Sequence, residues 1–241
     1  MRATRNSKLS RSSKPRIRQA VKPHPFAAAA NAWEYAAIAA VLAVIATLAA
    51  LGFHKAGYVL YNNDGEAHLE IARRILDSRT PGYEQIGTVW LPLPHALMLP
   101  FVGDMQRWQT GWAATLPGIC CFVLAGTMLY GAARAAYQSG AAAACAAMVF
   151  ALNPNLLYSQ TTPMNEHVFF AMQLGVLFFT VRFAQTQAIR YVVIAAIFAA
   201  GATLTRYDGW FLLPFTCLYV FAVANEKRLR TALIFAGVAG M

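Results

Sequence analysis

The sequence predicts an all-α protein, a polytopic helical bundle embedded in a membrane. Of its 241 residues, 58% are hydrophobic and 12% are charged. A soluble domain carries about 25% charged residues, roughly twice this fraction. The apolar residues fall into several runs close to the length of about 20 residues that a membrane-spanning helix requires. Since the polar residues gather between these runs, we expect the chain to cross the membrane several times.

Six apolar segments predict spanning helices, and a seventh begins near Thr231. The six lie at roughly 34–53, 112–131, 140–158, 165–184, 188–205 and 209–224. The first follows a basic stretch, as in a signal peptide, but its apolar run is too long and no clear cleavage site follows it, so we expect an uncleaved helix. Because the chain ends inside an apolar run at Met241, we expect it to be truncated, the N-terminal part of a longer protein.

The positive charge is concentrated at the N-terminus. Eight of the 20 basic residues and none of the 10 acids lie in the first 22 positions. We expect residues 1–30 to form a disordered cytoplasmic tail that contacts anionic membrane lipids rather than nucleic acid. With this N-terminus inside, Arg134 and the basic turns near 182–190 and 227–230 also fall inside. Residues 31–241 then form one transmembrane domain.

The first outer loop, residues 54–111, is predicted to contain two interfacial helices. Residues 66–78 carry an apolar stripe at helical spacing but are too few to span the membrane. Residues 79–89 predict a loop. Residues 90–103 are apolar, but the segment is about 14 residues long and contains three prolines, so a second interfacial or partly inserted helix beginning near Pro94 is expected rather than a span.

Acidic residues concentrate on the outer side in this topology, and only Glu34 and Glu226 fall inside. Acids contribute little to the direction of membrane insertion. Their gathering on one face therefore suggests a functional use. The eight outer acids are Asp64, Glu66, Glu70, Asp77, Glu84, Asp104, Glu166 and Asp208.

Three ionisable side chains follow the first spanning helix at alternate positions. On a helix, Asp64 and His68 share one face while Glu66 points elsewhere. Asp64 is a candidate general base for an acceptor hydroxyl, and with His68 it is a candidate to hold a divalent cation or to orient an acceptor. Capping is the alternative role, because Asn63 and Glu66 fit a capping box and Asp64 is itself a good N-cap. Asn63 can cap the helix while Asp64 stays free.

Two later turns bring polar residues to the same face. Glu166 and His167 open an otherwise apolar helix, where the helix dipole and a cap from Asn165 offer a purely structural explanation. Arg206 lies outside, against the positive-inside pattern. It is a candidate clamp for phosphate, and an ion pair with Asp208 is a compatible alternative.

The outer residues together provide carboxylates, histidines and an arginine, which suit a reaction between a phosphate-linked donor and a nucleophile. Lys55, Arg73 and Arg74 are further phosphate candidates. No HExxH, P-loop, GxSxG or dinucleotide motif is present. The cysteines fit no zinc pattern and are expected to be small buried side chains: Cys120, Cys121, Cys145 and Cys217.

The order of these features resembles the GT-C superfamily of integral-membrane glycosyltransferases, which includes protein O-mannosyltransferases and lipid A aminoarabinose transferases. Residues 64–73 (DGEAHLEIAR) look like its acidic motif running into the first juxtamembrane helix, and residues 90–95 (WLPLPH) are similar to the entry to the second. Residues 164–166 stand where related sequences carry another acid, and residues 204–206 where many carry a threonine and a basic residue. One difference is that Gly65 separates the two acids of the first motif, which are adjacent in many members.

The resemblance covers residues 30–241 and implies inverting transfer of a sugar from a polyprenyl-phosphate donor. The acceptor would be a lipid, glycan or protein at the periplasmic face of the inner membrane. Asp64 would be the catalytic base, with Glu166 as a second catalytic acid, and Arg206 would hold the leaving phosphate. Metal use differs within the superfamily, so a divalent metal stays open. Further substrate contacts are expected from His68, Glu66, His167 and Asp208.

Two other classes of function stay open. A multi-pass transporter or lipid flippase keeps its acids near the middle of several spans, whereas here they lie at one end of the inferred spans. A non-catalytic membrane subunit would need none of the outer polar residues.

Overall fold

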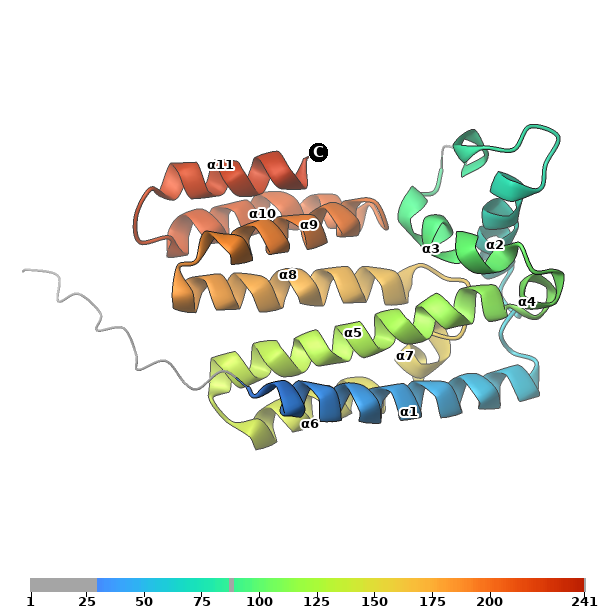
Figure 1. Cartoon of the computed structure of the whole chain (residues 1–241), viewed down its shortest axis with the longest axis horizontal. Coiled ribbons are helices and arrows are strands. Elements are labelled where there is room, and N and C mark those ends of the chain that lie inside the picture. The colour runs from blue at the N-terminus through green and yellow to red at the C-terminus, as the bar shows by residue number, and fades with distance from the viewer. Residues whose placement is uncertain (1–29, 87–88, 241) are drawn as a thin grey trace, which may run out of the picture.

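The computed structural model describes residues 30–86 and 89–240, and these residues form helices and connecting loops without strands (Figure 1). The basic tail predicted for residues 1–30 lies almost wholly outside the described residues. The helices are α1 (Ala32–Ala56), α2 (Asn63–Leu76), a 3-10 helix (Tyr83–Ile86), α3 (Pro92–Val102), α4 (Met105–Thr110), α5 (Trp112–Tyr137), α6 (Gly140–Ala151), α7 (Pro154–Ser159), α8 (Glu166–Thr186), α9 (Ile189–Thr203), α10 (Asp208–Val223) and α11 (Arg228–Ala239).

The long helices lie side by side, and the short helices α2, α3 and α4 gather at one end of them (Figure 1). Helix α5 packs against both α1 and α8, and α8 continues the packing to α9. The turn before α8 and the turn between α9 and α10 point to the end that carries α2 and α3. Three segments that are distant in the sequence therefore share one end of the bundle.

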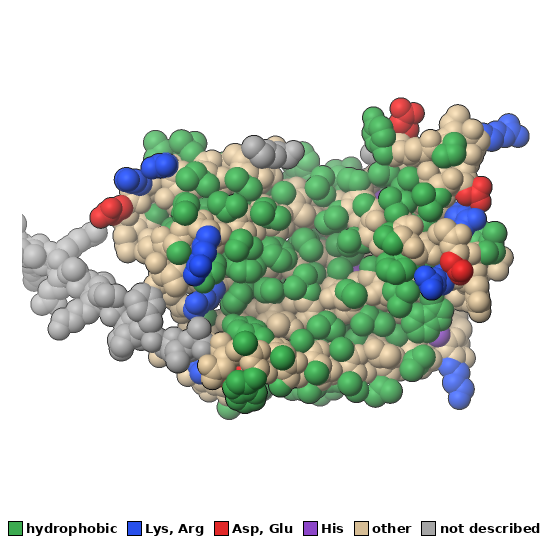
Figure 2. Space-filling view, viewed as in Figure 1, with side chains coloured by type: hydrophobic (Ala, Val, Ile, Leu, Met, Phe, Trp, Pro, Cys, Tyr) green, Lys and Arg blue, Asp and Glu red, His purple; other side chains and the backbone are tan. Residues whose placement is uncertain are grey.

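Three helices, α1, α5 and α8, are long and apolar enough to cross a membrane by length and composition. Helices α9 and α10 are apolar but shorter, at 15 and 16 residues. Figure 2 shows charged side chains toward the two ends of the molecule and a broad hydrophobic surface between them. The expected all-α, multi-pass membrane architecture is confirmed.

The segment predicted to span at 140–158 is not one continuous helix, because the chain breaks there into α6 and α7. Pro154 has no N–H to continue a helix. Asn153 instead caps α7, its Oδ1 accepting the N–H of Asn155 at 3.0 Å. The chain thus turns before α8 and forms a loop, residues 160–165, at the end of the bundle that carries α2.

Buried polar side chains hold this loop. The Thr115 hydroxyl of α5 donates to the carbonyl of Thr161 at 2.7 Å. The Gln160 side chain donates to the carbonyl of Ala46 in α1 at 3.1 Å. Since both Thr115 and Gln160 are fully buried, these bonds form where water does not compete and fix the loop before α8.

Both helices expected in the segment 54–111 are present, although α3 begins at Pro92 rather than near Pro94. Arg73 fastens α2 to the end of α3. Its guanidinium donates to the carbonyls of Val102 and Gly103 and to Asp77, and lies 5.5 Å from the ring centre of Trp108. Because these contacts occupy Arg73, it is not available as the phosphate ligand that the sequence suggested.

The expectation of four buried cysteines is wrong for two of them. Cys121 is buried and Cys217 partly buried, whereas Cys120 and Cys145 are exposed. Both exposed cysteines lie on apolar helices, and a small hydrophobic side chain is as stable against lipid as in the core.

Gly118 allows α5 to approach the loop before α8. A Cβ at this position would overlap the carbonyl oxygen of Gln160, which belongs to the backbone. By contrast, a Cβ on Gly140 would meet no atom within 4 Å.

We expect Gly118→Ala to destabilise the protein by about 1–3 kcal/mol, since the loop must shift to relieve the overlap. Gly140→Ala is the matched control and should change stability little. Thermal unfolding of both variants in detergent micelles tests this. Equal melting temperatures for Gly118→Ala and the wild type would contradict it.

Candidate functional site

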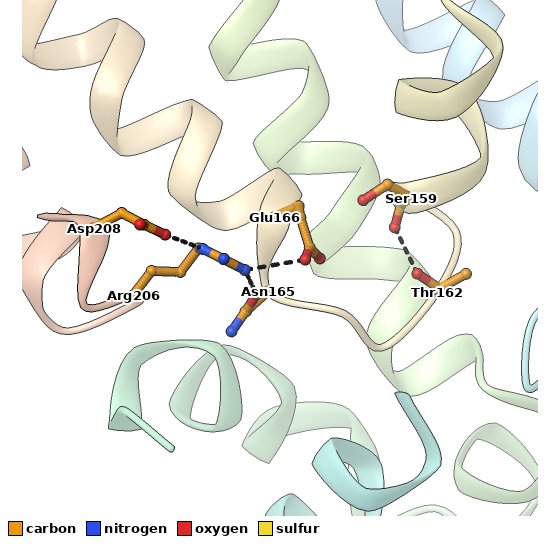
Figure 3. A network of polar contacts seen from close by, with 6 residues as sticks. All are labelled: Ser159, Thr162, Asn165, Glu166, Arg206 and Asp208. Atoms are coloured by element: carbon orange, nitrogen blue, oxygen red, sulfur yellow. Dashed lines mark hydrogen bonds and ion pairs between the residues drawn. The ribbon is translucent and has the colours of Figure 1, made fainter. Parts of the chain in front are cut away.

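Arg206 joins the starts of α8 and α10 (Figure 3). Its Nη1 donates to Oδ1 of Asn165 at 2.8 Å and to Oε1 of Glu166 at 3.0 Å. Its Nε donates to Oδ2 of Asp208 at 2.9 Å. Glu166 and Asp208 are the first residues of their helices, where the helix dipole favours a carboxylate. The expected ion pair between Arg206 and Asp208 is confirmed, and Glu166 is a second partner.

The guanidinium of Arg206 keeps one edge free. Its Nη2 makes no hydrogen bond to any described residue. The side chain is 34% exposed, so a ligand can approach it. A planar guanidinium that is fixed on two sides and open on the third is suited to an oxyanion.

Asn165 does not cap α8 as expected. Its backbone lies in the helical region, at φ −97° and ψ −6°, and its side chain makes no capping bond. An N-cap residue needs an extended backbone to reach the first turn with its side chain. The Asn165 side chain instead accepts from Arg206, so it orients the guanidinium.

Asp64 is exposed on the first turn of α2, and its carboxylate forms no hydrogen bond or ion pair with any described residue. The cap is Asn62, whose Oδ1 accepts the N–H of Asp64 at 2.9 Å. The expectation that Asn63 caps is wrong, because the helix begins one residue earlier and includes Asn63. The carboxylate of Asp64 is free nonetheless. Glu66 is exposed on the same turn.

Gly65 places this turn of α2 against the loop before α8. A Cβ on Gly65 would lie 3.3 Å from Cδ of Pro163 and 3.9 Å from Sδ of Met164. A side chain at position 65 would press on the loop that leads to Glu166. This contact gives a physical reason for the glycine between Asp64 and Glu66.

His68 and His95 form a buried pair between α2 and α3. Nδ1 of His68 lies 2.9 Å from Nε2 of His95. The two residues are 3% and 0% exposed, and the Trp90 ring lies against His68 with centroids 4.5 Å apart. Sequence reasoning missed His95 and Trp90 as site residues. The signal for His95 was an ionisable side chain inside an apolar, proline-rich segment.

The histidine pKa values connect the pair to the charged residues around it. Burial lowers the pKa of His68; the Asp64 carboxylate opposes this shift and the Arg206 guanidinium adds to it. Burial lowers the pKa of His95 to about 4, with His68 acting in the same direction and the Leu91 carbonyl against it. His68 therefore lies within electrostatic reach of Asp64 and Arg206, and both histidines are neutral at pH 7.

Two hydrogen bonds tie α3 to the Arg206 turn. The N–H of Leu93 lies in the first turn of α3 and donates to the carbonyl of Leu204 at the end of α9, at 2.9 Å. The Tyr207 hydroxyl donates to the carbonyl of Val89 at 3.1 Å. The segment that carries Trp90 and His95 is thus fixed next to the turn that carries Arg206.

Several buried polar atoms at this end of the bundle have no hydrogen-bond partner among the described residues. They include Oγ of Ser159, Oε2 of Glu166, Nδ1 of His167 and Nδ1 of His95. Unpaired buried polar atoms are rare because each costs free energy, and they often mark sites that bind a ligand. His167 faces α5, next to Gly118, rather than the outer surface.

The structure thus brings Glu166, Arg206 and Asp208 into contact and places Asp64 and His68 nearby. Within residues 30–86 and 89–240, no group of three or more His, Cys, Asp or Glu side chains is arranged to hold a metal ion. The free carboxylate of Asp64, the neutral imidazole of His68 and the open edge of Arg206 offer a proton acceptor, a hydrogen-bonding group and an oxyanion ligand.

Comparison with known proteins adds one match. A family model described as dolichyl-phosphate-mannose-protein mannosyltransferase matches residues 102–241. No curated protein and no solved structure matches the chain. The matched range includes Glu166 and Arg206 but begins after α2 and most of α3, so Asp64, His68 and His95 lie outside it.

We expect stability to depend on pH through His95. The pKa of His95 is lower in the folded protein than in the unfolded chain, where it is about 6.5. The neutral side chain therefore contributes its full stabilisation above pH 6.5. This contribution is lost as the pH falls from 6.5 toward the pKa of about 4 in the folded protein, and its full size is on the order of 3 kcal/mol. Hydrogen exchange of α3 amides between pH 7 and 4.5 measures the loss. His95→Gln should flatten this dependence, and an unchanged slope in that variant would refute the assignment.

Proposed function

Because this chain belongs to the dolichyl-phosphate-mannose-protein mannosyltransferase family, and so is a membrane glycosyltransferase that uses a lipid-linked sugar donor, we propose the site for its reaction. The donor is a polyprenyl-phosphate sugar, and the sugar passes with inversion to an acceptor at the end of the bundle that carries α2 and α3. One observation carries the proposal. The guanidinium of Arg206 is fixed and partly open, and both this guanidinium and the Asp64 carboxylate lie within electrostatic reach of His68.

In the proposed step, a hydroxyl oxygen of the acceptor attacks the anomeric carbon while its proton passes to the Asp64 carboxylate. The bond between the anomeric carbon and the phosphate oxygen breaks, and the polyprenyl phosphate leaves with the bonding electron pair. Attack opposite the leaving group inverts the anomeric carbon. Nη2 of Arg206 stabilises the negative charge that develops on the leaving phosphate.

The charges around Arg206 determine how a phosphate can bind there. Glu166 and Asp208 together outnumber the single guanidinium, so an incoming phosphate meets a net negative cluster. Asp208 is 61% exposed, and an exposed pair contributes little free energy because water screens it. Asp208 is therefore the partner that a phosphate displaces. Glu166 and Asn165 keep Arg206 oriented, and this is the role we assign to Glu166.

A groove of about 780 Å³ supports a lipid-linked donor. It lies between α8 and α10 and is bordered by α5, α6 and the start of α7. Its apolar lining includes Phe170, Leu174 and Leu177 of α8 and Leu212 and Phe215 of α10. We assign this groove to the polyprenyl chain, which needs an apolar surface next to the membrane.

A small enclosed void shares Phe150, Leu156 and Phe170 with the groove and is also lined by Ser159 and His167. It is too narrow to hold a water molecule, so the proposed place of the polyprenyl chain is the groove itself.

The distribution of basic residues supports an outer location for the site. Arg134, the turn between α8 and α9, and the turn between α10 and α11 all lie at the opposite end of the bundle from α2 (Figure 1). By the positive-inside rule that end faces the cytoplasm. We therefore propose that transfer takes place at the periplasmic face of the inner membrane.

We expect Asp64→Asn to lower the transfer rate at least about 100-fold, since the amide cannot accept the hydroxyl proton. Glu70→Gln, an exposed acid on the same helix, should retain wild-type activity. Membranes containing each variant would be supplied with a radiolabelled polyprenyl-phosphate sugar, and folding would be checked by thermal unfolding. If folded Asp64→Asn retains half of the activity or more, Asp64 is not the base.

We expect Arg206→Lys to reduce kcat/KM for the donor about 10- to 100-fold, since one ammonium cannot hold Asn165, Glu166 and a phosphate in the geometry of a guanidinium. Arg79→Lys, at an exposed arginine between α2 and the 3-10 helix, is the matched control. Initial rates at varied donor concentration measure the effect. An unchanged kcat/KM in Arg206→Lys would show that positive charge, not the guanidinium geometry of Arg206, is what matters.

A further inference from the structure

A cavity of about 500 Å³ lies where the turn between α8 and α9 meets the turn between α10 and α11. Its lining includes three apolar side chains, Phe183, Ile189 and Ile234, and two basic ones, Lys227 and Arg230. Both turns lie at the end of the bundle opposite α2 (Figure 1). The cavity shares no lining residue with the groove between α8 and α10, so it is separate from the parts assigned to sugar transfer.

Gln187 holds the two turns together around this cavity. It follows the last residue of α8, in the left-handed backbone region at φ 55°. Its side-chain nitrogen donates to the carbonyl of Val223 at 3.2 Å, and its side-chain oxygen accepts the N–H of Asn225 at 3.0 Å. Because one side chain bonds to both residues that flank the end of α10, the second turn is fixed against the first. The cavity is therefore part of the folded structure, as binding sites usually are.

The two basic side chains of the cavity lack a carboxylate partner. Lys227 and Arg230 are exposed, and neither forms an ion pair with Glu226 or with any other described acid. The positive-inside rule accounts for basic residues at this end of the bundle, but not for their place on the wall of a cavity that is partly apolar. Glu226 also lines the cavity. The charged lining thus carries one more positive than negative charge, which favours an anionic ligand.

The mixture of apolar and basic lining indicates the class of anion. A small soluble anion would gain nothing from Phe183, Ile189 and Ile234, whereas a phospholipid has both a phosphate and acyl chains. Guanidinium and ammonium groups are the usual protein ligands of phosphate oxygens. With this end of the bundle facing the cytoplasm, the cavity opens toward the leaflet that carries anionic lipids, where basic pockets between helices bind lipid headgroups.

We propose that this cavity binds an anionic membrane phospholipid. Lys227 and Arg230 hold its phosphate, and an acyl chain lies against Ile189 and Ile234. The bound lipid contacts both turns, so it stabilises the packing of α8 and α9 against α10 and α11. The inference goes beyond the proposed sugar transfer and does not depend on it.

The experiment measures lipid binding to the full chain in detergent micelles by native mass spectrometry. Phosphatidylglycerol is the anionic probe, and phosphatidylcholine with the same acyl chains tests whether net negative charge is needed. Lys227→Asn removes one charge, and asparagine tolerates the left-handed backbone of this position, φ 49°. Arg230→Gln removes the other charge. Arg190→Gln is the matched control, because Arg190 is exposed at the same end of the bundle but does not line the cavity.

We expect one phosphatidylglycerol to bind at least about tenfold more tightly than phosphatidylcholine. Lys227→Asn and Arg230→Gln should each weaken this binding about fivefold, the effect of one basic residue beside an anionic lipid. Arg190→Gln should stay within about twofold of the wild type. Phosphatidylglycerol should also raise the melting temperature of the wild type, and raise it less in the double variant. Inorganic phosphate at the same concentration should not raise it.

Three results would overturn the inference. The first is phosphatidylglycerol that binds no more tightly than phosphatidylcholine. The second is a loss in Arg190→Gln as large as that in Lys227→Asn, which would show attraction by the overall charge of this end rather than by the cavity. The third is equal stabilisation by inorganic phosphate, which would assign the cavity to a free anion. Melting temperatures without lipid check that each variant folds, and Arg230→Gln alone carries the test if Lys227→Asn does not fold.

Discussion

One guanidinium holds together the end of the bundle that carries α2 and α3. Arg206 bonds to Asn165 and Glu166 at the start of α8 and to Asp208 at the start of α10. Both helix starts carry exposed amide donors and favour carboxylates, and two carboxylates at neighbouring helix starts would repel each other without a cation between them. Arg206 removes that repulsion and sets the spacing of the two turns. Two hydrogen bonds then fix α3 and the segment that carries Trp90 next to the Arg206 turn. The N–H of Leu93 donates to the carbonyl of Leu204, and the Tyr207 hydroxyl donates to the carbonyl of Val89.

The second constraint is close backbone approach. Gly118 lets α5 touch the carbonyl of Gln160, and Gly65 lets α2 lie against Pro163. The contact at Gly65 brings α2, which carries Asp64 and His68, against the loop before α8. The family match covers the Arg206 half of the site but not the α2 half. The assignment of Asp64 and His68 therefore rests on the geometry of this chain and on the burial that keeps His68 neutral.

The positions of the helices were predicted well from the sequence, and the hydrogen bonds at the helix ends were not. The helices α1, α5 and α8 follow from apolar length alone, and α2 follows from its apolar stripe. The caps were assigned to the wrong residues, Asn63 in place of Asn62 and Asn165 as a cap where it serves Arg206. Several residues near a helix start have side chains able to cap it. The choice among them depends on backbone angles that surrounding contacts impose, so a sequence pattern does not resolve it.

The sequence by itself determined the architecture and the type of chemistry. Apolar runs of spanning length require a membrane bundle, since in lipid a helix satisfies every backbone hydrogen bond within its own segment, and polar residues are confined to its ends because burying charge in lipid is costly. Only the tertiary structure decided which polar residues lie together. In the folded protein the 140–158 segment is divided into two helices, and the Arg73 guanidinium bonds to the end of α3. One edge of the Arg206 guanidinium stays open. The tertiary structure also pairs His68 with His95, 27 residues away. Such contacts join residues distant in the chain, so they arise from how the helices pack rather than from any local pattern.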